Sequence, residues 1–256
     1  MWTVRAGLAA VLCALAAAGC SSGGSAPQPA TTAAKASGVS ASEVAVRLKH
    51  GLTGLTSAHL AVEAGAIGGT SDGEFSFAAG KATASQITLD QAGSKVEVIT
   101  VGASSYAKLP RAQNTSGKPW IKVRSDSTNE FVRGLSASLA LNQAVASLSD
   151  VVNLAGKAQS VRDRGNERIG GSATRHYSMT VVASGGVGST GLEQELALLG
   201  NKPVPVDLWL DRSGRPVKIA VALPLGGQTF PVTVLGSRFN VPVKISAPRP
   251  GQVSSQ

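Results

Sequence analysis

The sequence predicts an α+β fold in which a large curved antiparallel sheet, a half-barrel, wraps around two or three helices and is either packed solid or left partly open as a hydrophobic cavity. Three observations predict this class. Short alternating segments broken by Gly, Ser or Asp recur along the chain, as in antiparallel strands joined by turns. Three Ser/Thr-x-x-Glu capping boxes precede apolar repeats of helical period. Hydrophobic residues make up 43% of the chain, which is enough to build a core.

The amino-terminal residues are typical of an export signal. After a singly positive start, residues 6–18 are continuously apolar, which is too short for a membrane-spanning helix of about 20 residues. Small residues follow, so residues 1–19 are predicted to be a signal peptide. The motif Ala17-Ala-Gly-Cys20 resembles the bacterial lipobox, in which cleavage exposes a cysteine that carries diacylglycerol. Ordinary secretion after Gly19 is the alternative.

Cysteine usage favours lipidation of Cys20. The other cysteine, Cys13, lies in the predicted signal peptide, so the mature chain keeps one cysteine, at its first position. Acylation would protect this thiol and anchor the exported protein to the outer face of the cell membrane. Residues 20–39 are then the lipidated cysteine and a tether, because their Ser, Gly, Ala, Thr and Pro content cannot bury a core.

The folded domain is predicted to span residues 40–247 and to be followed by a disordered tail at 248–256. Its first helix covers 41–53, where Ser40 and Glu43 form a capping box. A hairpin is expected around residues 211–215, Asp-Arg-Ser-Gly-Arg. An antiparallel sheet of about ten strands accounts for the alternating segments. These are 59–64, 74–80, 82–90, 95–101, 105–109, 120–124, 157–163, 174–182, 204–210, 216–223, 228–235 and 239–245.

A second helix is predicted from the box at Ser127 and Glu130 to about residue 152, and a short third helix over 190–199. Apolar residues cover more of the second helix than a single stripe would, so this helix is expected to contact apolar surface on two sides. Five of its side chains are the predicted cavity wall. They are Phe131, Leu135, Leu139, Val145 and Leu148, which are equally good core residues.

No catalytic, metal or cofactor site is predicted. The motif Gly186-x-Gly-x-x-Gly191 has dinucleotide-fingerprint spacing, but the next strand enters a hairpin rather than a second βαβ unit. Ser105 and Lys108 have the S-x-x-K spacing of penicillin-interacting enzymes, but in a strand they point to opposite sides. The three histidines, His50, His59 and His176, have no partner at metal-ligand spacing.

The formal charge is +9, and it excludes little by itself. The lysines and arginines are scattered, and no aromatic platform lies among them, so nucleic acid is not an expected partner. The charge fits attraction to an anionic membrane surface. It equally fits side chains that are simply solvated at the protein surface.

The order of segments resembles the mycobacterial lipoprotein family that includes LppX, LprA, LprF and LprG. This resemblance covers roughly residues 40–247. The matching stretches are Ser105-Tyr-Ala-Lys-Leu109 with Trp120, Val151-Val-Asn-Leu154, Gly165-x-Glu-x-Ile-Gly-Gly171, Pro203-Val-Pro-Val-Asp-Leu-Trp-Leu-Asp211 and Phe239-Asn-Val-Pro-Val243.

The resemblance implies a LolA-like half-barrel whose hydrophobic cavity holds the acyl chains of lipids or glycolipids in transit through the cell envelope. A membrane-anchored, non-enzymatic lipid carrier is therefore expected, with a lipid ligand, the membrane and a membrane transporter as candidate partners. The alternative is a non-enzymatic envelope scaffold or sensor with a filled core.

Overall fold

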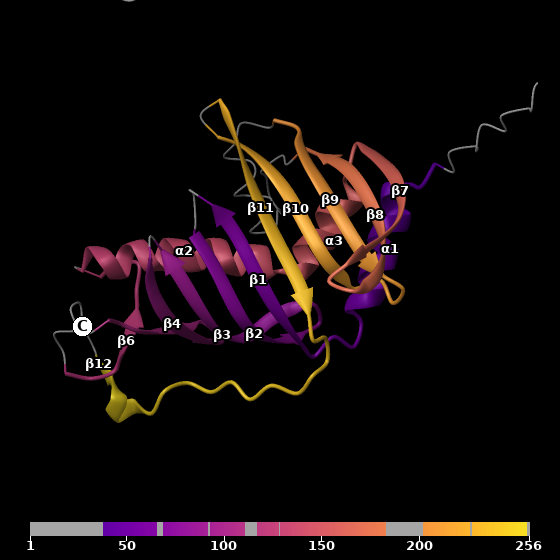
Figure 1. The fold of residues 1–256 in the computed structure, drawn as a ribbon. Coiled ribbons are helices and arrows are strands. Elements are labelled where there is room, and N and C mark those ends of the chain that lie inside the picture. The colour runs from indigo at the N-terminus through magenta and orange to yellow at the C-terminus, as the bar shows by residue number, and fades with distance from the viewer. Residues whose placement is uncertain are drawn as a thin grey trace, which may run out of the picture. The chain divides into compact units, whose positions relative to one another are not determined.

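The computed structural model describes residues 38–65, 69–91, 93–110, 117–127, 129–182, 202–225 and 227–254, all within one unit of the chain, Ser37–Gln256. In this part of the chain a twelve-stranded sheet curves around three α-helices (Figure 1). The sheet is open, with β12 and β7 at its edges, and only the β12–β6 pair is parallel. The predicted α+β half-barrel is confirmed.

Two runs of sequential strands build the sheet, and β1 joins β11 between them. The first run is β1 (Ser57–Gly65), β2 (Gly69–Ala78), β3 (Lys81–Gln91), β4 (Ser94–Val101), β5 (Ser104–Lys108) and β6 (Trp120–Val123). The second run is β7 (Ser160–Ile169), β8 (Ser172–Val181), β9 (Val204–Asp211), β10 (Pro216–Leu225) and β11 (Gln228–Ser237).

Helix α1 (Ala41–Leu52) begins at the predicted capping box. The Ser40 hydroxyl accepts from the backbone N–H of Glu43 at 3.2 Å, and the Glu43 carboxylate accepts from the backbone N–H of Ser40 at 2.7 Å. Val44 and Leu48 then fall on one face and are buried, as helical spacing requires. This helix packs on α3.

The predicted second helix is two helices, α2 (Glu130–Ala146) and α3 (Leu148–Gly156). Ser147 interrupts it, because its backbone leaves the helical region at φ −76° and ψ 80°. The predicted cap at Ser127 is also wrong. The Asn129 side chain accepts from the N–H of Phe131 at 3.0 Å and of Val132 at 3.4 Å, so Asn129 satisfies the donors that a cap must satisfy.

The core lies between the helices and the sheet face that they cover. Alternate residues of β1, Ala58, Leu60, Val62 and Ala64, are buried, which is the period of a strand with one face covered. Each of the three helices contributes buried side chains to this core. These are Leu48 and Leu52 from α1, Val132, Leu135 and Leu139 from α2, and Leu148, Val151 and Leu154 from α3.

A glycine-to-glycine contact fixes α1 against the turn between β9 and β10. A Cβ added at Gly51 would lie 2.1 Å from the backbone carbon of Gly214, and one added at Gly214 would lie 2.2 Å from the carbonyl oxygen of Arg47. Gly214 also has a φ of +84°, which favours glycine. Asp211 closes this turn by accepting from the N–H groups of Ser213 and Arg215, each at 2.9 Å. The predicted hairpin is confirmed.

The opposite sheet face carries a polar cluster around Trp209. Its neighbours Leu208 and Leu210 join the core, so Trp209 points away from the helices. The indole N–H donates to Glu167 at 2.7 Å, and the His176 ring stacks on the indole at 4.2 Å between centroids. The two His176 nitrogens lie 2.7 Å from Glu167 and 2.8 Å from Asp207. His176 is therefore not isolated, because strand register brings it partners that its spacing in the sequence does not reveal.

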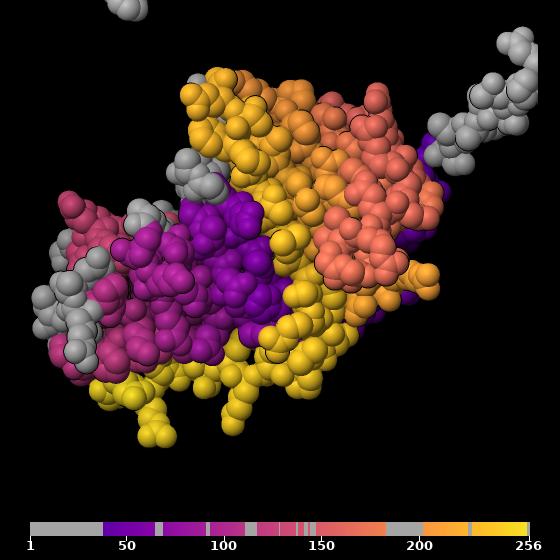
Figure 2. All heavy atoms as spheres, in the orientation of Figure 1, coloured from indigo at the N-terminus to yellow at the C-terminus, as the bar shows by residue number. Residues whose placement is uncertain are grey.

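The expected disordered tail is wrong for residues 248–254. A 3-10 turn, Pro250–Gln252, leads into β12 (Val253–Ser254), which pairs with Trp120 and Ile121 of β6. The unpaired edge of β6 offers backbone hydrogen-bonding groups, so even a two-residue segment is ordered there. Figures 1 and 2 show the C-terminal segment running along the ends of the strands toward this edge.

The expected strand at 239–245 is also wrong. Both edges of β11 are already occupied, by β1 and β10, and Arg238 and Asn240 have positive φ angles of 50° and 61°. The chain therefore turns away from the sheet. The Asn240 side chain accepts from the N–H of Thr56 at 2.9 Å, and the Ser57 hydroxyl donates to the carbonyl of Val241 at 2.5 Å.

The predicted third helix at 190–199 lies outside the described residues, as does the Gly186–Gly191 loop. Among the described helices, none is long and apolar enough to cross a membrane.

Gly51→Ala is expected to lower the free energy of unfolding by about 1–3 kcal/mol, because the added methyl overpacks a backbone contact. Gly134→Ala is the matched control. It lies in α2, where an added Cβ meets nothing within 4 Å, so a gain of up to about 1 kcal/mol from helix propensity is expected. Urea denaturation followed by circular dichroism measures both. Equal stability gains in the two variants would show that the contact does not constrain α1.

Glu167→Gln is expected to make stability less dependent on acid pH. Hydrogen bonds from Trp209 and then His176 lower the pKa of Glu167 below its ordinary value of 4.5. A carboxylate with a depressed folded-state pKa stabilises the fold above its ordinary pKa, and this contribution is lost as pH falls through the folded-state pKa.

Urea unfolding from about pH 7 to about pH 3 should therefore show a gap between wild type and Glu167→Gln that closes in acid. Glu63→Gln, at an exposed position of β1, is the control without this hydrogen-bond set. A gap that stays constant across the range would contradict the assigned role of Glu167.

Candidate functional site

The helices and the covered sheet face bring most of the predicted cavity-wall residues into the hydrophobic core. Leu135 and Leu139 of α2 are 1% and 4% exposed, and Leu148 of α3 is 1% exposed. Phe131 is partly buried against the same cluster. The side chain of Val145 lies outside the described residues. These positions suit both a cavity wall and a filled core, so the assignment stays a prediction.

Leu139 also lies at the edge of a polar groove of about 570 Å³ between α2 and strands β5 and β6. Lys122 and Arg124 line the groove from the sheet side. Arg124 is held by Asp126, with hydrogen bonds of 2.8 and 2.6 Å. The groove therefore places hydrogen-bonding groups next to one end of the aliphatic interior.

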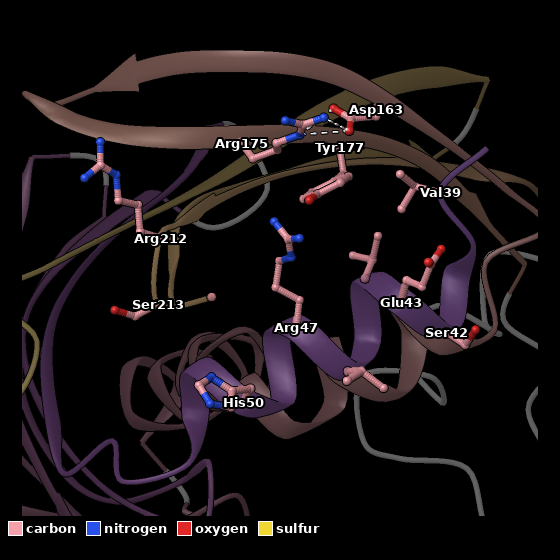
Figure 3. A pocket seen from close by; sticks show the side chains of 13 residues that line it. Val39, Ser42, Glu43, Arg47, His50, Asp163, Arg175, Tyr177, Arg212 and Ser213 are labelled. Carbon is pink, nitrogen blue, oxygen red and sulfur yellow. Dashed lines mark hydrogen bonds and ion pairs between the residues drawn. The ribbon is translucent and has the colours of Figure 1, made fainter. Parts of the chain in front are cut away.

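A larger pocket of about 680 Å³ lies between α1, strands β7 and β8, and the β9–β10 turn. Figure 3 shows Arg47 extending from α1 toward the ring of Tyr177, with Arg212 and Ser213 at the turn across from the helix. The Gly51–Gly214 contact places the turn beside the helix, so the same contact shapes one wall of this pocket.

Asp163 and Arg175 form an ion pair in the pocket wall. The Arg175 Nε donates to the Asp163 carboxylate at 2.8 Å, and the backbone N–H of Gly165 donates to it at 2.9 Å. Burial pushes the pKa of Asp163 upward, but the hydrogen bonds from Arg175 and Gly165 outweigh it, so this pKa lies below its usual value. The hydrogen bond to Asp163 in turn raises the pKa of Arg175. Both groups are therefore charged at neutral pH.

Two further pocket residues have perturbed acidities. The backbone N–H and then the hydroxyl of Ser40 lower the pKa of Glu43, whose carboxylate is engaged in the helix cap. Burial raises the pKa of Tyr177, which is 2% exposed. The tyrosine is therefore a neutral phenol at physiological pH, and the Arg47 guanidinium carbon lies 6.0 Å from its ring centroid.

No pattern in the sequence predicts this pocket. Arg47, Arg175 and Arg212 are far apart in the chain, and each reads as an ordinary surface charge. Only the turn motif around Gly214 could have indicated a close approach of two backbones, and it does not identify α1 as the partner.

No metal site is seen in the part of the chain that is described. There, no group of three or more His, Cys, Asp or Glu side chains is placed to hold a metal ion. Ser105 and Lys108, the S-x-x-K pair, have separate partners. The Ser105 hydroxyl is 2.9 Å from that of Thr100, and the Lys108 ammonium is 3.4 Å from Glu97. Cys20, the predicted lipidation site, lies outside the described residues.

Comparison with solved structures identifies the fold. No protein-family model matches the chain, and no curated protein matches its sequence. The lipoprotein LppX of Mycobacterium tuberculosis matches with a TM-score of 0.52 and 19% identity, over 79% of this chain and 98% of LppX. LprF of Mycobacterium bovis matches with a TM-score of 0.54 and 15% identity, over 81% of this chain and 96% of LprF. The chain is thus similar to LppX and LprF over most of its length and shares their fold.

Proposed function

We propose that this protein is an exported lipoprotein, anchored through Cys20 to the outer face of the cell membrane, that binds lipids or glycolipids and carries them through the cell envelope. The observation that carries the proposal is the half-barrel fold, similar to that of two mycobacterial lipoproteins, with an aliphatic face between sheet and helices. We propose no catalytic activity for it.

The chemistry of the covered face supports acyl chains as the bound part of the ligand. Its side chains are almost all Val, Leu, Ile and Ala, and each methylene transferred from water to such a surface contributes about 0.8 kcal/mol. Few polar groups are available there to select one chain over another. Lipid class would therefore be recognised outside the aliphatic interior, by the polar parts of the protein.

A filled-core envelope scaffold is the second candidate. The observation that favours it is the near-complete burial of Leu135, Leu139 and Leu148 within one hydrophobic cluster. In that case the helices and the sheet pack on each other without a ligand between them.

Mass spectrometry of the protein extracted from membranes in mild detergent distinguishes the two candidates. The carrier predicts about one lipid per chain, and Leu139→Trp is expected to lower that occupancy severalfold by filling the space beside α2. Arg133→Trp, at an exposed position of the same helix, is the matched control and should load normally.

Circular dichroism and thermal melting establish that each tryptophan variant is folded, since overpacking costs about 1–3 kcal/mol. Leu139→Phe is the milder substitution if the tryptophan prevents folding. A wild-type protein that carries no lipid would refute the carrier function. Normal loading of folded Leu139→Trp would remove α2 from the binding site.

Cys20→Ala is expected to release the protein from the membrane. Without the thiol no diacylglycerol can be attached, and the loss of two acyl chains removes most of the membrane affinity. Detergent phase partitioning of cells that express each form measures the change, with Cys13→Ala as the control inside the signal peptide. Retention of Cys20→Ala in the detergent phase would contradict lipid anchoring at this position.

A further inference from the structure

The pocket beside α1 contains more positive charge than its carboxylates neutralise. It is lined by three arginines, Arg47, Arg175 and Arg212, and by two carboxylates, Asp163 and Glu43. Asp163 is engaged by Arg175 and by the N–H of Gly165, and Glu43 is engaged by the helix cap. Among the described residues, neither Arg47 nor Arg212 forms an ion pair with a carboxylate. The Arg47 charge does lower the pKa of Glu43 and of Asp163, and its guanidinium hydrogen-bonds the Tyr177 side chain. Both arginines are exposed, and a guanidinium has five N–H donors, so Arg47 keeps donors for a ligand beyond its bond to Tyr177.

The walls of the pocket set the backbone positions of these two arginines. Arg47 extends from α1 toward the Tyr177 ring, and Arg212 stands on the turn that Gly214 docks against that helix (Figure 3). The Asp163–Arg175 pair closes the far wall. Because the helix and the turn meet through backbone atoms, the spacing of the two arginine Cα positions is set by the fold.

An apolar rim adjoins the charged groups. Val46 lines the same pocket and is 67% exposed, the highest value among the exposed large hydrophobic side chains of the described residues. Val39 also lines the pocket. Guanidinium groups next to exposed aliphatic carbon fit a ligand that has an anionic group close to apolar carbon.

We propose that this pocket binds a phosphate ester, contacted by the guanidinium group of Arg47 and by that of Arg212, whose exposed side chain turns toward the ligand from the β9–β10 turn. Guanidinium groups present N–H donors whose geometry matches phosphate oxygens, and such charge-assisted bonds are roughly twice as strong as neutral ones. The phosphate can come from a phospholipid headgroup or from a water-soluble ester. The inference goes beyond the proposed function, because a protein without lipid in its interior could still bind phosphate here.

Isothermal titration of the purified full chain separates these sources. Sodium phosphate probes the bare anion, and dihexanoyl-phosphatidylglycerol below its micelle concentration probes an anionic phosphodiester on a lipid. If both probes bind and the lipid binds more tightly, the natural ligand is a lipid headgroup, because the apolar rim adds contacts to the lipid. Equal binding of both assigns a soluble ester. Dihexanoyl-phosphatidylcholine, which has no net charge, is expected to bind at least about tenfold more weakly than the phosphatidylglycerol.

The double variant Arg47→Gln/Arg212→Gln is expected to weaken binding of both anionic probes by about tenfold or more, since each guanidinium contributes a charged hydrogen bond. Lys81→Gln/Lys95→Gln removes the same charge from β3 and β4 and should leave the affinity within about twofold. All four side chains belong to exposed residues, and circular dichroism verifies folding.

Undiminished affinity in folded Arg47→Gln/Arg212→Gln, or no binding of either anionic probe by the wild type, would overturn the proposal. Neither result depends on whether the extracted protein carries a lipid. The phosphate site and the carrier function can therefore fail separately.

Discussion

The backbone contact between Gly51 and Gly214 is the constraint on which this end of the molecule depends. It lets α1 approach the β9–β10 turn more closely than any side chain would allow. Val44 and Leu48 can then reach the core, and α3 is covered by α1. The same contact leaves Arg47 facing the sheet across an open pocket. One pair of glycines thus sets both the packing of the first helix and the position of the charged groups.

The fold separates apolar from charged surfaces. Aliphatic side chains fill the face between helices and sheet, while charged groups gather at two places around it, beside α1 and beside α2. If the ligand has acyl chains and a polar headgroup, the chains would bind in the aliphatic interior. The headgroup would then be selected by the charged side chains beside it. The outer face has a different role, because the cluster around Trp209 ties β7, β8 and β9 together through side chains.

Local signals in the sequence predicted the elements better than the contacts between them. The Ser40 box and the Asp211–Arg215 turn were correct because each depends on residues within a few positions of one another. The break at Ser147 was missed, since the apolar pattern continues across it. Pairing of β12 with β6 was missed because it depends on the free edge of β6, which is distant in the sequence. The composition of residues 248–256 does not indicate that edge.

The candidate sites show the same distinction. Burial of Leu135, Leu139 and Leu148 follows from helical period, so it could be predicted. Whether they border a ligand could not, because packed and open interiors use the same aliphatic residues. The partners of His176 and the grouping of Arg47 with Arg212 arise from register and tertiary packing. A single sequence contains no local pattern for either.

The C-terminal segment has a mechanical consequence. It is fastened near the middle of the sheet, where Ser57 holds Val241, and again at the β6 edge, where Val253 pairs with Trp120. The chain between Val241 and Val253 can reach at most roughly 40 Å. This limits how far apart its two attachment points can move. It limits how far the β1–β6 half can flatten, whereas in the described chain the β7–β11 half has no such brace.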